Sequence, residues 1–317
     1  MNKRLIQLSL IILVLVSATG YSYQPVITIG ATGYAGVGSS DPSAPNLSVG
    51  PEVNLDFRAI AGSWGYVAAW YTGHLWFDSA TTPVYAHDTG GLLGVQLGEV
   101  ATEVRAALAY SSTIGDGSTF ATPEWRVSAD IPTGVARLEL ALGGFYHVEP
   151  ETDELEVTHD LEFAVAYDRS LELTVTGGVA PFASVFPDQD RVDIGGQAYL
   201  ATEGLLGFFT WWDASLAGGI VESDEDSNDR VFATLAGSIE TSTVRSLTSS
   251  AALRLKLSSY PALDTTALRI EPTAGIDWNP FGGIYLQAEL SGVYGISRDA
   301  TMDGWNVGGS LGLHYRF

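Results

Sequence analysis

The chain has 317 residues, no cysteine and a formal net charge of −22. Without cysteine it has neither disulfides nor thiolate metal sites, and its strongly negative charge argues against a nucleic-acid partner. Beyond the N-terminal segment, no apolar run approaches the ~18 residues of a membrane-spanning helix.

The N-terminus has the features of a secretory signal peptide. Lys3 and Arg4 precede an apolar run at residues 5–16, and small residues follow. A run of this length is too short for a spanning helix, which argues against a membrane anchor. We therefore expect residues 1–22 to be cleaved after Sec export and residues 23–317 to form a single domain. The cleavage site stays open among Ala18, Gly20 and Ser22.

Alternating apolar and polar residues then recur from Val26 to the end, in segments of about 11 to 15 residues. In residues 49–61, for example, Val53 and Leu55 share one face while Asp56 lies on the other. Successive side chains of a strand point to opposite sides of a sheet, so each segment is expected to be a strand with one apolar face. The pattern indicates an all-β chain with about sixteen strands, and about fourteen as the alternative.

Short and long connections alternate between these segments, which is typical of membrane barrels with short periplasmic turns and longer outer loops. The connection at 241–247 is long for a turn and suggests an irregularity. The short set is 62–63, 97–99, 132–134, 168–170, 202–204 and 279–282. The longer, more acidic set is 36–46, 79–90, 149–156, 187–191, 222–230 and 297–303.

The last segment alternates almost without error and ends on an aromatic residue. Trp305, Leu313, Tyr315 and Phe317 lie on its apolar face. It resembles the closing strand of bacterial outer-membrane β-barrels, and this resemblance implies that the barrel-assembly machinery reads the terminal aromatic. The expected assembly residues are therefore Trp305, Tyr315 and Phe317.

The whole mature chain resembles a Gram-negative outer-membrane porin-type barrel. The resemblance implies a transmembrane antiparallel up-and-down barrel in contact with outer-membrane lipid. Trimeric porins carry a long third outer loop that narrows the pore, whereas the corresponding connection here, at 113–118, is short. This difference argues against such a constriction and against a trimer, and the sequence leaves the oligomeric state open.

Charged side chains of inward parity are expected to line a wet lumen, because an apolar interior would leave them unpaired. Acids and bases are intermixed between Glu103 and Glu139, where opposite charges could form a cross-strand ladder. Between Asp160 and Glu240 we expect inward acids without an inward base. These charges could simply keep the interior hydrated. Alternatively, they could create an electric field across the lumen that orients polar solutes. The expected pore-lining residues are Arg58, Arg105, Arg126, Arg137, Asp160, Glu162, Glu172, Asp213, Arg254, Lys256 and Arg269.

No enzyme, cofactor or metal site is expected. The chain has no His-Glu-x-x-His motif, and His159 falls on the apolar face. Its one Gly-x-Ser-x-Gly stretch, at residues 308–312, lies within the alternating last segment and not at a strand-to-helix turn, so no nucleophile elbow is expected. The acidic run at 222–229 resembles the start of a calcium loop but lacks its glycine and closing glutamate, which favours a solvated outer loop. Inward aromatics at Tyr199, Phe209 and Trp211 could stack on sugars or simply pack. The aromatic-rich segment with Trp64, Tyr66, Trp70 and Trp76 has an ambiguous register.

The sequence therefore predicts a passive outer-membrane channel for small hydrophilic solutes, with a mild cation preference from its acidic lumen and mouth. The alternative is a non-conducting barrel that binds partners or divalent cations through its acidic outer loops.

Overall fold

A computed structural model describes residues 26–39, 46–60, 65–78, 83–113, 119–149, 154–170, 173–244, 246–298 and 303–316. Several expectations lie wholly or mostly outside these residues, namely the signal peptide, the turn at 62–63, the connection at 113–118, Trp64, Glu172 and Phe317.

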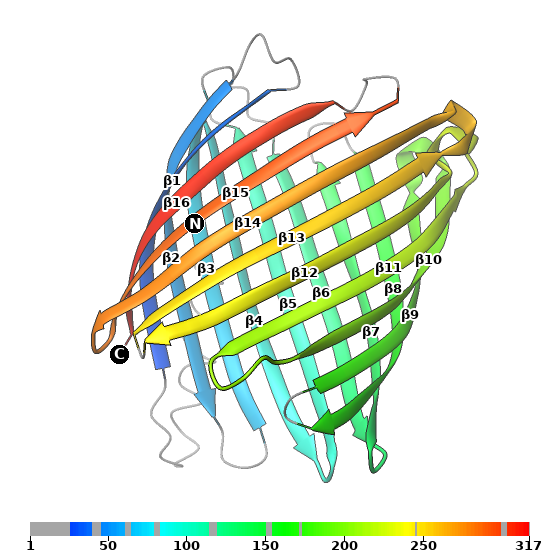
Figure 1. Cartoon of the computed structure of the whole chain (residues 1–317). Helices are drawn as coiled ribbons and strands as arrows, with labels where there is room; N and C mark the ends of the chain where they lie inside the picture. Colours follow the sequence, from blue (N-terminus) through cyan, green and yellow to red (C-terminus); the bar gives the residue numbers. More distant parts are fainter. Residues whose placement is uncertain are drawn as a thin grey trace, which may run out of the picture.

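The described residues form a closed barrel of sixteen antiparallel strands, as the alternating segments predicted (Figure 1). Each strand pairs with its neighbours in sequence, and the first strand pairs with the last. Closure leaves no unpaired sheet edge, which a lipid environment requires because unpaired backbone groups there cost several kcal/mol each. The strands are β1 (Val26–Ser39), β2 (Asn46–Ile60), β3 (Gly65–Asp78), β4 (Val84–Leu97), β5 (Val100–Thr113), β6 (Thr119–Pro132), β7 (Ala136–Glu149), β8 (Glu154–Ser170), β9 (Leu173–Phe186), β10 (Arg191–Leu205), β11 (Thr210–Ser223), β12 (Arg230–Val244), β13 (Leu247–Tyr260), β14 (Thr265–Phe281), β15 (Ile284–Ser297) and β16 (Gly304–Arg316).

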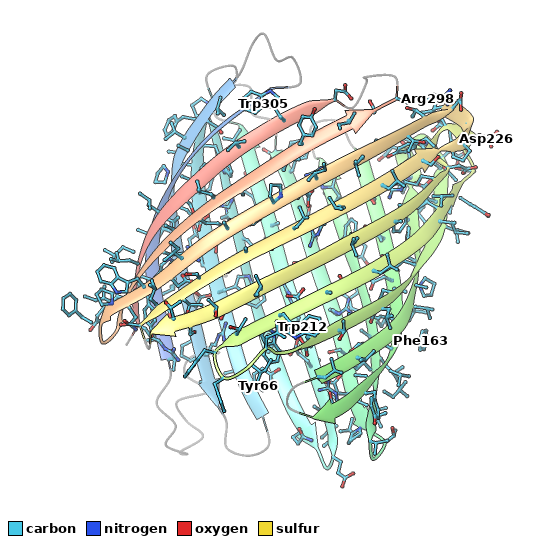
Figure 2. The ribbon with its side chains drawn as sticks, in the orientation of Figure 1. Tyr66, Phe163, Trp212, Asp226, Arg298 and Trp305 are labelled. Carbon is cyan, nitrogen blue, oxygen red and sulfur yellow. The ribbon has the colours of Figure 1, made fainter. Side chains whose placement is uncertain are left out.

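Three short 3-10 turns lie between strands at one rim, which we take as the outer rim. They are η1 (Pro187–Gln189), η2 (Asp226–Asn228) and η3 (Pro261–Leu263). Asp226 and Arg298 mark this rim in Figure 2, and Tyr66 lies toward the opposite end. Among the described residues, no helix has both the length and the apolar character needed to span a membrane.

Strand registers assign the two faces of the wall. Large apolar side chains such as Val53, Phe163 and Leu216 lie exposed on the outer face, and Phe163 points away from the barrel in Figure 2. Charged residues such as Arg126 and Glu162 alternate with them and contact one another on the inner face. Each face thus follows from the period-2 pattern of the sequence.

Two connections near the opposite, periplasmic rim are informative. The turn expected at 202–204 is wrong, because β10 continues to Leu205, which pairs with Trp211 of β11. The connection is instead Leu206 to Phe209, closed by a hydrogen bond from the Leu206 N–H to the Thr210 carbonyl at 2.7 Å. The irregularity expected at 241–247 is confirmed as a register shift between Ser242 and Val244.

Candidate functional site

The inner wall is the candidate site, and its most connected part joins three strands. Arg126 of β6 forms ion pairs with two residues of β8, Asp160 at 3.4 Å and Glu162. The Tyr199 hydroxyl of β10 donates to the other oxygen of Glu162 at 2.6 Å. These contacts cross β7 and β9, so the side chains lie along the wall rather than project into the barrel.

A second network occupies the inner face of β3 to β6. Arg105 pairs with Glu124 at 3.6 Å, and its guanidinium carbon lies 4.9 Å from the ring centre of Trp70. The Trp70 indole N–H donates to Asp88 at 3.0 Å. Arg105 and Arg126 are direct cross-strand partners and repel each other. Each is instead paired with an acid elsewhere on the wall, Arg105 with Glu124 and Arg126 with Glu162.

A further pair of ion pairs lies near the periplasmic end of β7. Arg137 pairs with Glu139 of its own strand at 3.3 Å and with Asp168 of β8 at 3.6 Å. Arg58 is exposed near the same end of β2, where it pairs in register with Val26 of β1. The ladder predicted between residues 103 and 139 is therefore formed only in part. Among the described residues of that range, Arg105–Glu124 is the cross-strand ion pair, and the other bridges lie within β7 or extend to β8.

Bases are in excess on β13 and β14. Arg254 and Arg269 both contact Glu271, at 3.6 and 2.5 Å, and their side chains are 62% and 57% exposed. Lys256 is the cross-strand partner of Arg269 and is also exposed. Two arginines thus share one acid, beside a lysine, on an exposed stretch of wall.

The acid-only arc expected between Asp160 and Glu240 is wrong. Arg126 reaches into it from β6, and Arg191 at the start of β10 pairs with Asp193 at 3.2 Å. Arg230 begins β12 at an inner-face position. The sequence predicts Arg191 and Arg230 in outer loops, because acidic turn residues run directly into these strands and leave their first residues poorly marked. Asp213 accepts a hydrogen bond from the Ser238 hydroxyl on β12.

Inner aromatic rings lie against glycines of the adjacent strand, a pairing that the sequence reading missed. Tyr66 and Trp70 of β3 are the register partners of Gly94 and Gly90 of β4, and a Cβ atom on either glycine would collide with the ring. The glycines let the rings lie flat. In the sequence, an inward-facing glycine directly opposite an inward-facing aromatic residue would indicate this packing. It can be recognised only when the register of the two strands is known.

The three aromatics that could either stack on sugars or pack are not brought together. Phe209 lies in the connection after β10 rather than on the wall, and Trp211 is near the periplasmic end of β11. Tyr199 lies over Gly178 and is bonded to Glu162.

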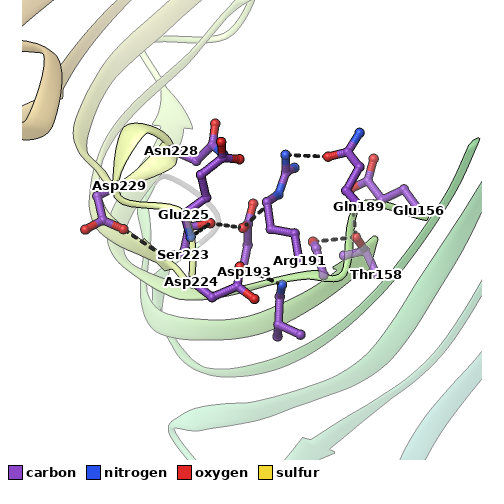
Figure 3. A network of polar contacts seen from close by, with 12 residues as sticks. Glu156, Thr158, Gln189, Arg191, Asp193, Ser223, Asp224, Glu225, Asn228 and Asp229 are labelled. Carbon is purple, nitrogen blue, oxygen red and sulfur yellow. Dashed lines mark hydrogen bonds and ion pairs between the residues drawn. The ribbon is translucent and has the colours of Figure 1, made fainter. Parts of the chain in front are cut away.

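The outer rim has its own polar network, shown in Figure 3. Backbone N–H groups of Ser223 and Val192 donate to Asp229 at 2.7 Å and to Asp224 at 3.0 Å. Arg191 stacks over Phe186 at 3.6 Å and donates to the Gln189 side chain at 2.8 Å. Two carboxylates of the acidic run therefore stabilise this turn by accepting hydrogen bonds from backbone N–H groups. In the described part of the chain, no group of three or more His, Asp and Glu side chains is placed to hold a metal.

Aromatic residues gather near both ends of the outer face. On the same face, which its parity predicted, His159 lies between Trp125 and Tyr146, with ring centres 6.1 and 6.0 Å away. Trp305 and Tyr315 also have outer-face positions, near opposite ends of β16, and Tyr315 pairs with Ile29 of β1 at the seam. Trp305 and Trp212 lie toward opposite ends of the barrel in Figure 2.

No protein-family model matches the chain, and no curated protein matches it. Solved structures do. OccK1 of Pseudomonas aeruginosa has a TM-score of 0.56 at 8% identity, over 94% of this chain and 100% of that chain. OccAB1 of Acinetobacter baumannii has a TM-score of 0.55 at 10% identity, over 94% and 98%. An anion-selective porin from Comamonas acidovorans has a TM-score of 0.52 at 12% identity, over 93% and 100%.

At these identities the likeness is one of fold. The fold is a closed sixteen-stranded barrel with an apolar outer face between aromatic ends, which suits a lipid bilayer. The chain has the fold of outer-membrane β-barrels of porin architecture, as its sequence predicted.

Proposed function

We propose that the chain is a passive outer-membrane channel for small hydrophilic solutes, with a mild cation preference. The observation that carries this proposal is the character of the inner wall. Charged side chains such as Arg254 and Arg269 stay more than half exposed there, and among the described residues no large side chain is fully buried. A wall of this kind needs water beside it, because isolated charges without water or partners are strongly unfavourable.

The proposed cation preference rests on the balance of charge. On the described strands, inner-face carboxylates outnumber inner-face bases, and exposed acids such as Asp224 and Glu225 add negative charge at the outer rim. A negative potential raises the local concentration of cations at a mouth and along a lumen. The basic stretch around Lys256 opposes this locally, so we expect the preference to be mild.

Planar-bilayer recording of the refolded, full-length mature chain tests the proposal. We expect stable ohmic current steps and, in a salt gradient, a reversal potential of cationic sign. The preference should weaken as salt rises, because the Debye length falls from about 30 Å at 0.01 M to about 10 Å at 0.1 M. A folded barrel that inserts but passes no current would contradict the channel and favour a surface-interaction barrel. An anionic reversal potential would contradict only the selectivity.

Two partners complete the proposal. The outer face would contact membrane lipid, and the last strand would be read by the barrel-assembly machinery. The predicted signal peptide at residues 1–22 would direct export, which N-terminal mass determination of the mature protein tests by locating the cleavage site.

A further inference from the structure

The register of β3, ambiguous from sequence, is assigned by its two neighbours. Tyr66 pairs with Gly94, Trp70 with Asp56 and Gly90, and Trp76 with Val84, all at inner-face positions. Three aromatic side chains therefore follow one strand along about 30 Å of inner wall, at ~3.3 Å per residue. We call Tyr66, Trp70 and Trp76 the β3 track.

Two rings of the β3 track are open to the lumen. Tyr66 and Trp76 are 44% and 38% exposed. Trp70 rests on Gly90, so its ring covers the wall instead of crossing the barrel. Near the outer end, Tyr34 of β1 packs against Trp76, with ring centres 4.2 Å apart and planes inclined by 51°. A solute moving along this wall would meet open aromatic surface near both ends of β3, with the Arg105 guanidinium over Trp70 between them.

Hydrogen-bonding groups accompany each level of the track. The Tyr66 hydroxyl donates to Glu103 at 2.5 Å, and the Trp70 indole donates to Asp88 at 3.0 Å. Glu52 lies near Trp76, within 3.4 Å of the His74 ring whose centre is 5.8 Å from that of Trp76. Acceptors thus flank the rings, and Arg105 supplies donors above Trp70.

This combination matches a saccharide better than a charged solute. A sugar ring has an apolar C–H face that packs on an aromatic ring, and hydroxyls at its edge that both donate and accept hydrogen bonds. Carboxylates at the ring edges accept from hydroxyls, and an arginine donates to them. An organic cation would find Arg105 already over Trp70 and would be repelled there.

We propose that the β3 track is a binding path for neutral linear saccharides passing through the barrel. The inference rests on the proposed channel function and adds a solute class to it. Its contacts are separated along the strand, so a chain of sugar rings would bind at several weak points and be released from each. Weak, multi-site binding is what conduction requires, because a solute that binds tightly does not leave.

Current block by maltohexaose tests the inference on the full-length mature protein in planar bilayers. We expect a saturable decrease in ion current, whereas polyethylene glycol of matched mass should lower the current in proportion to its concentration. Trp76→Ala should weaken the maltohexaose affinity about threefold to tenfold. Trp76→Phe, which keeps a ring, should retain most of the affinity, so that a purely structural effect can be separated from stacking.

Phe232→Ala is the matched control. Phe232 lies over Gly219 on β12, on the wall opposite β3, and its loss removes the same kind of contact away from the track. It should leave the affinity unchanged. Equal weakening by Phe232→Ala and Trp76→Ala, or block by maltohexaose no greater than by the polymer, would overturn the inference. Saturable block by phenyltrimethylammonium alone would replace it with a cation site. A wild-type barrel without current would instead reject the channel itself.

Discussion

Arg126 and Glu162 form an ion pair that passes over an intervening strand, from β6 to β8. The contact is possible because β7 presents small residues at this height. Gly143 is the register partner of both Arg126 and Asp160, and a Cβ atom on it would lie 2.8 Å from an Asp160 oxygen. A single arginine thereby offsets two carboxylates that the sequence had left without a base.

Arg126→Gln should increase the cation preference of the channel. The substitution removes one positive charge and leaves Asp160 and Glu162 without their ion-pair partner. The reversal potential in a low-salt gradient should shift further in the cationic direction. Arg126→Lys keeps the charge and serves as the control, with a reversal potential near that of the wild type. A shift of equal size in both variants would show that selectivity does not follow this charge.

Gly90→Ala should destabilise the barrel by about 1–3 kcal/mol through overpacking. The new methyl group would collide with the Trp70 ring, which would have to turn away from the wall and take Arg105 with it. We also expect a smaller single-channel conductance, because these side chains would move into the lumen.

Gly91→Ala is the adjacent control for that change. Gly91 lies on the outer face, and its Cβ atom would meet only the Ala68 carbonyl at 3.6 Å, an ordinary contact. Replacing glycine here should be neutral or stabilise the fold by up to about 1 kcal/mol, by restricting the unfolded chain. Denaturant titration in vesicles gives both values, and equal destabilisation by the two variants would contradict the ring-over-glycine packing.

Leu216→Arg should cost about 2–4 kcal/mol of unfolding free energy, as expected for a charge facing lipid near mid-membrane. Leu216 lies near the middle of β11 and is 56% exposed on the outer face. Ser215→Arg changes the neighbouring residue, which faces the inner wall, and should be mild. Denaturant titration in vesicles compares the two. If Ser215→Arg proved the costlier, the β11 register would be wrong by one residue, because a one-residue slip exchanges the faces.

The faces of the strands could be read from the sequence, but the partners of their side chains could not. Period-2 alternation alone put Arg105 and Asp160 on the inner face. That Arg126 contacts Glu162 depends on two successive registers, which no local pattern encodes. The same holds for Trp70 and Gly90, whose positions are twenty residues apart yet directly opposite.

The ends of several strands also could not be predicted from the sequence. The sequence predicts a turn at Gly204. In the structure β10 continues to Leu205, because Gly204 and Leu205 still pair with Trp212 and Trp211 of β11. A glycine within an alternating segment can indicate a turn, but it can equally lie inside a strand where a neighbouring group approaches the backbone closely. The residue classes at the inner wall were therefore predictable, while the boundaries that put Arg191 and Arg230 on the wall were not.

Removing the aromatic end of the last strand should impair assembly. Tyr315 is on the outer face of β16, where it pairs with Ile29 of β1 and Ile284 of β15, so it stands at the seam that closes the barrel. Tyr315→Ser combined with deletion of Phe317 would weaken both the closing contact and the proposed assembly signal. We expect a lower fraction of the faster-migrating, unheated form on gels and more protease-sensitive periplasmic material.

Tyr294→Ser provides the comparison for this last variant. Tyr294 is also an outer-face aromatic, near the outer end of β15, but it is neither at the seam nor at the terminus. Loss of a generic interfacial aromatic should affect both variants alike, whereas loss of an assembly signal should affect only the C-terminal one. Normal outer-membrane levels of the Tyr315→Ser variant lacking Phe317 would refute the role of this strand in assembly and leave the barrel fold untouched.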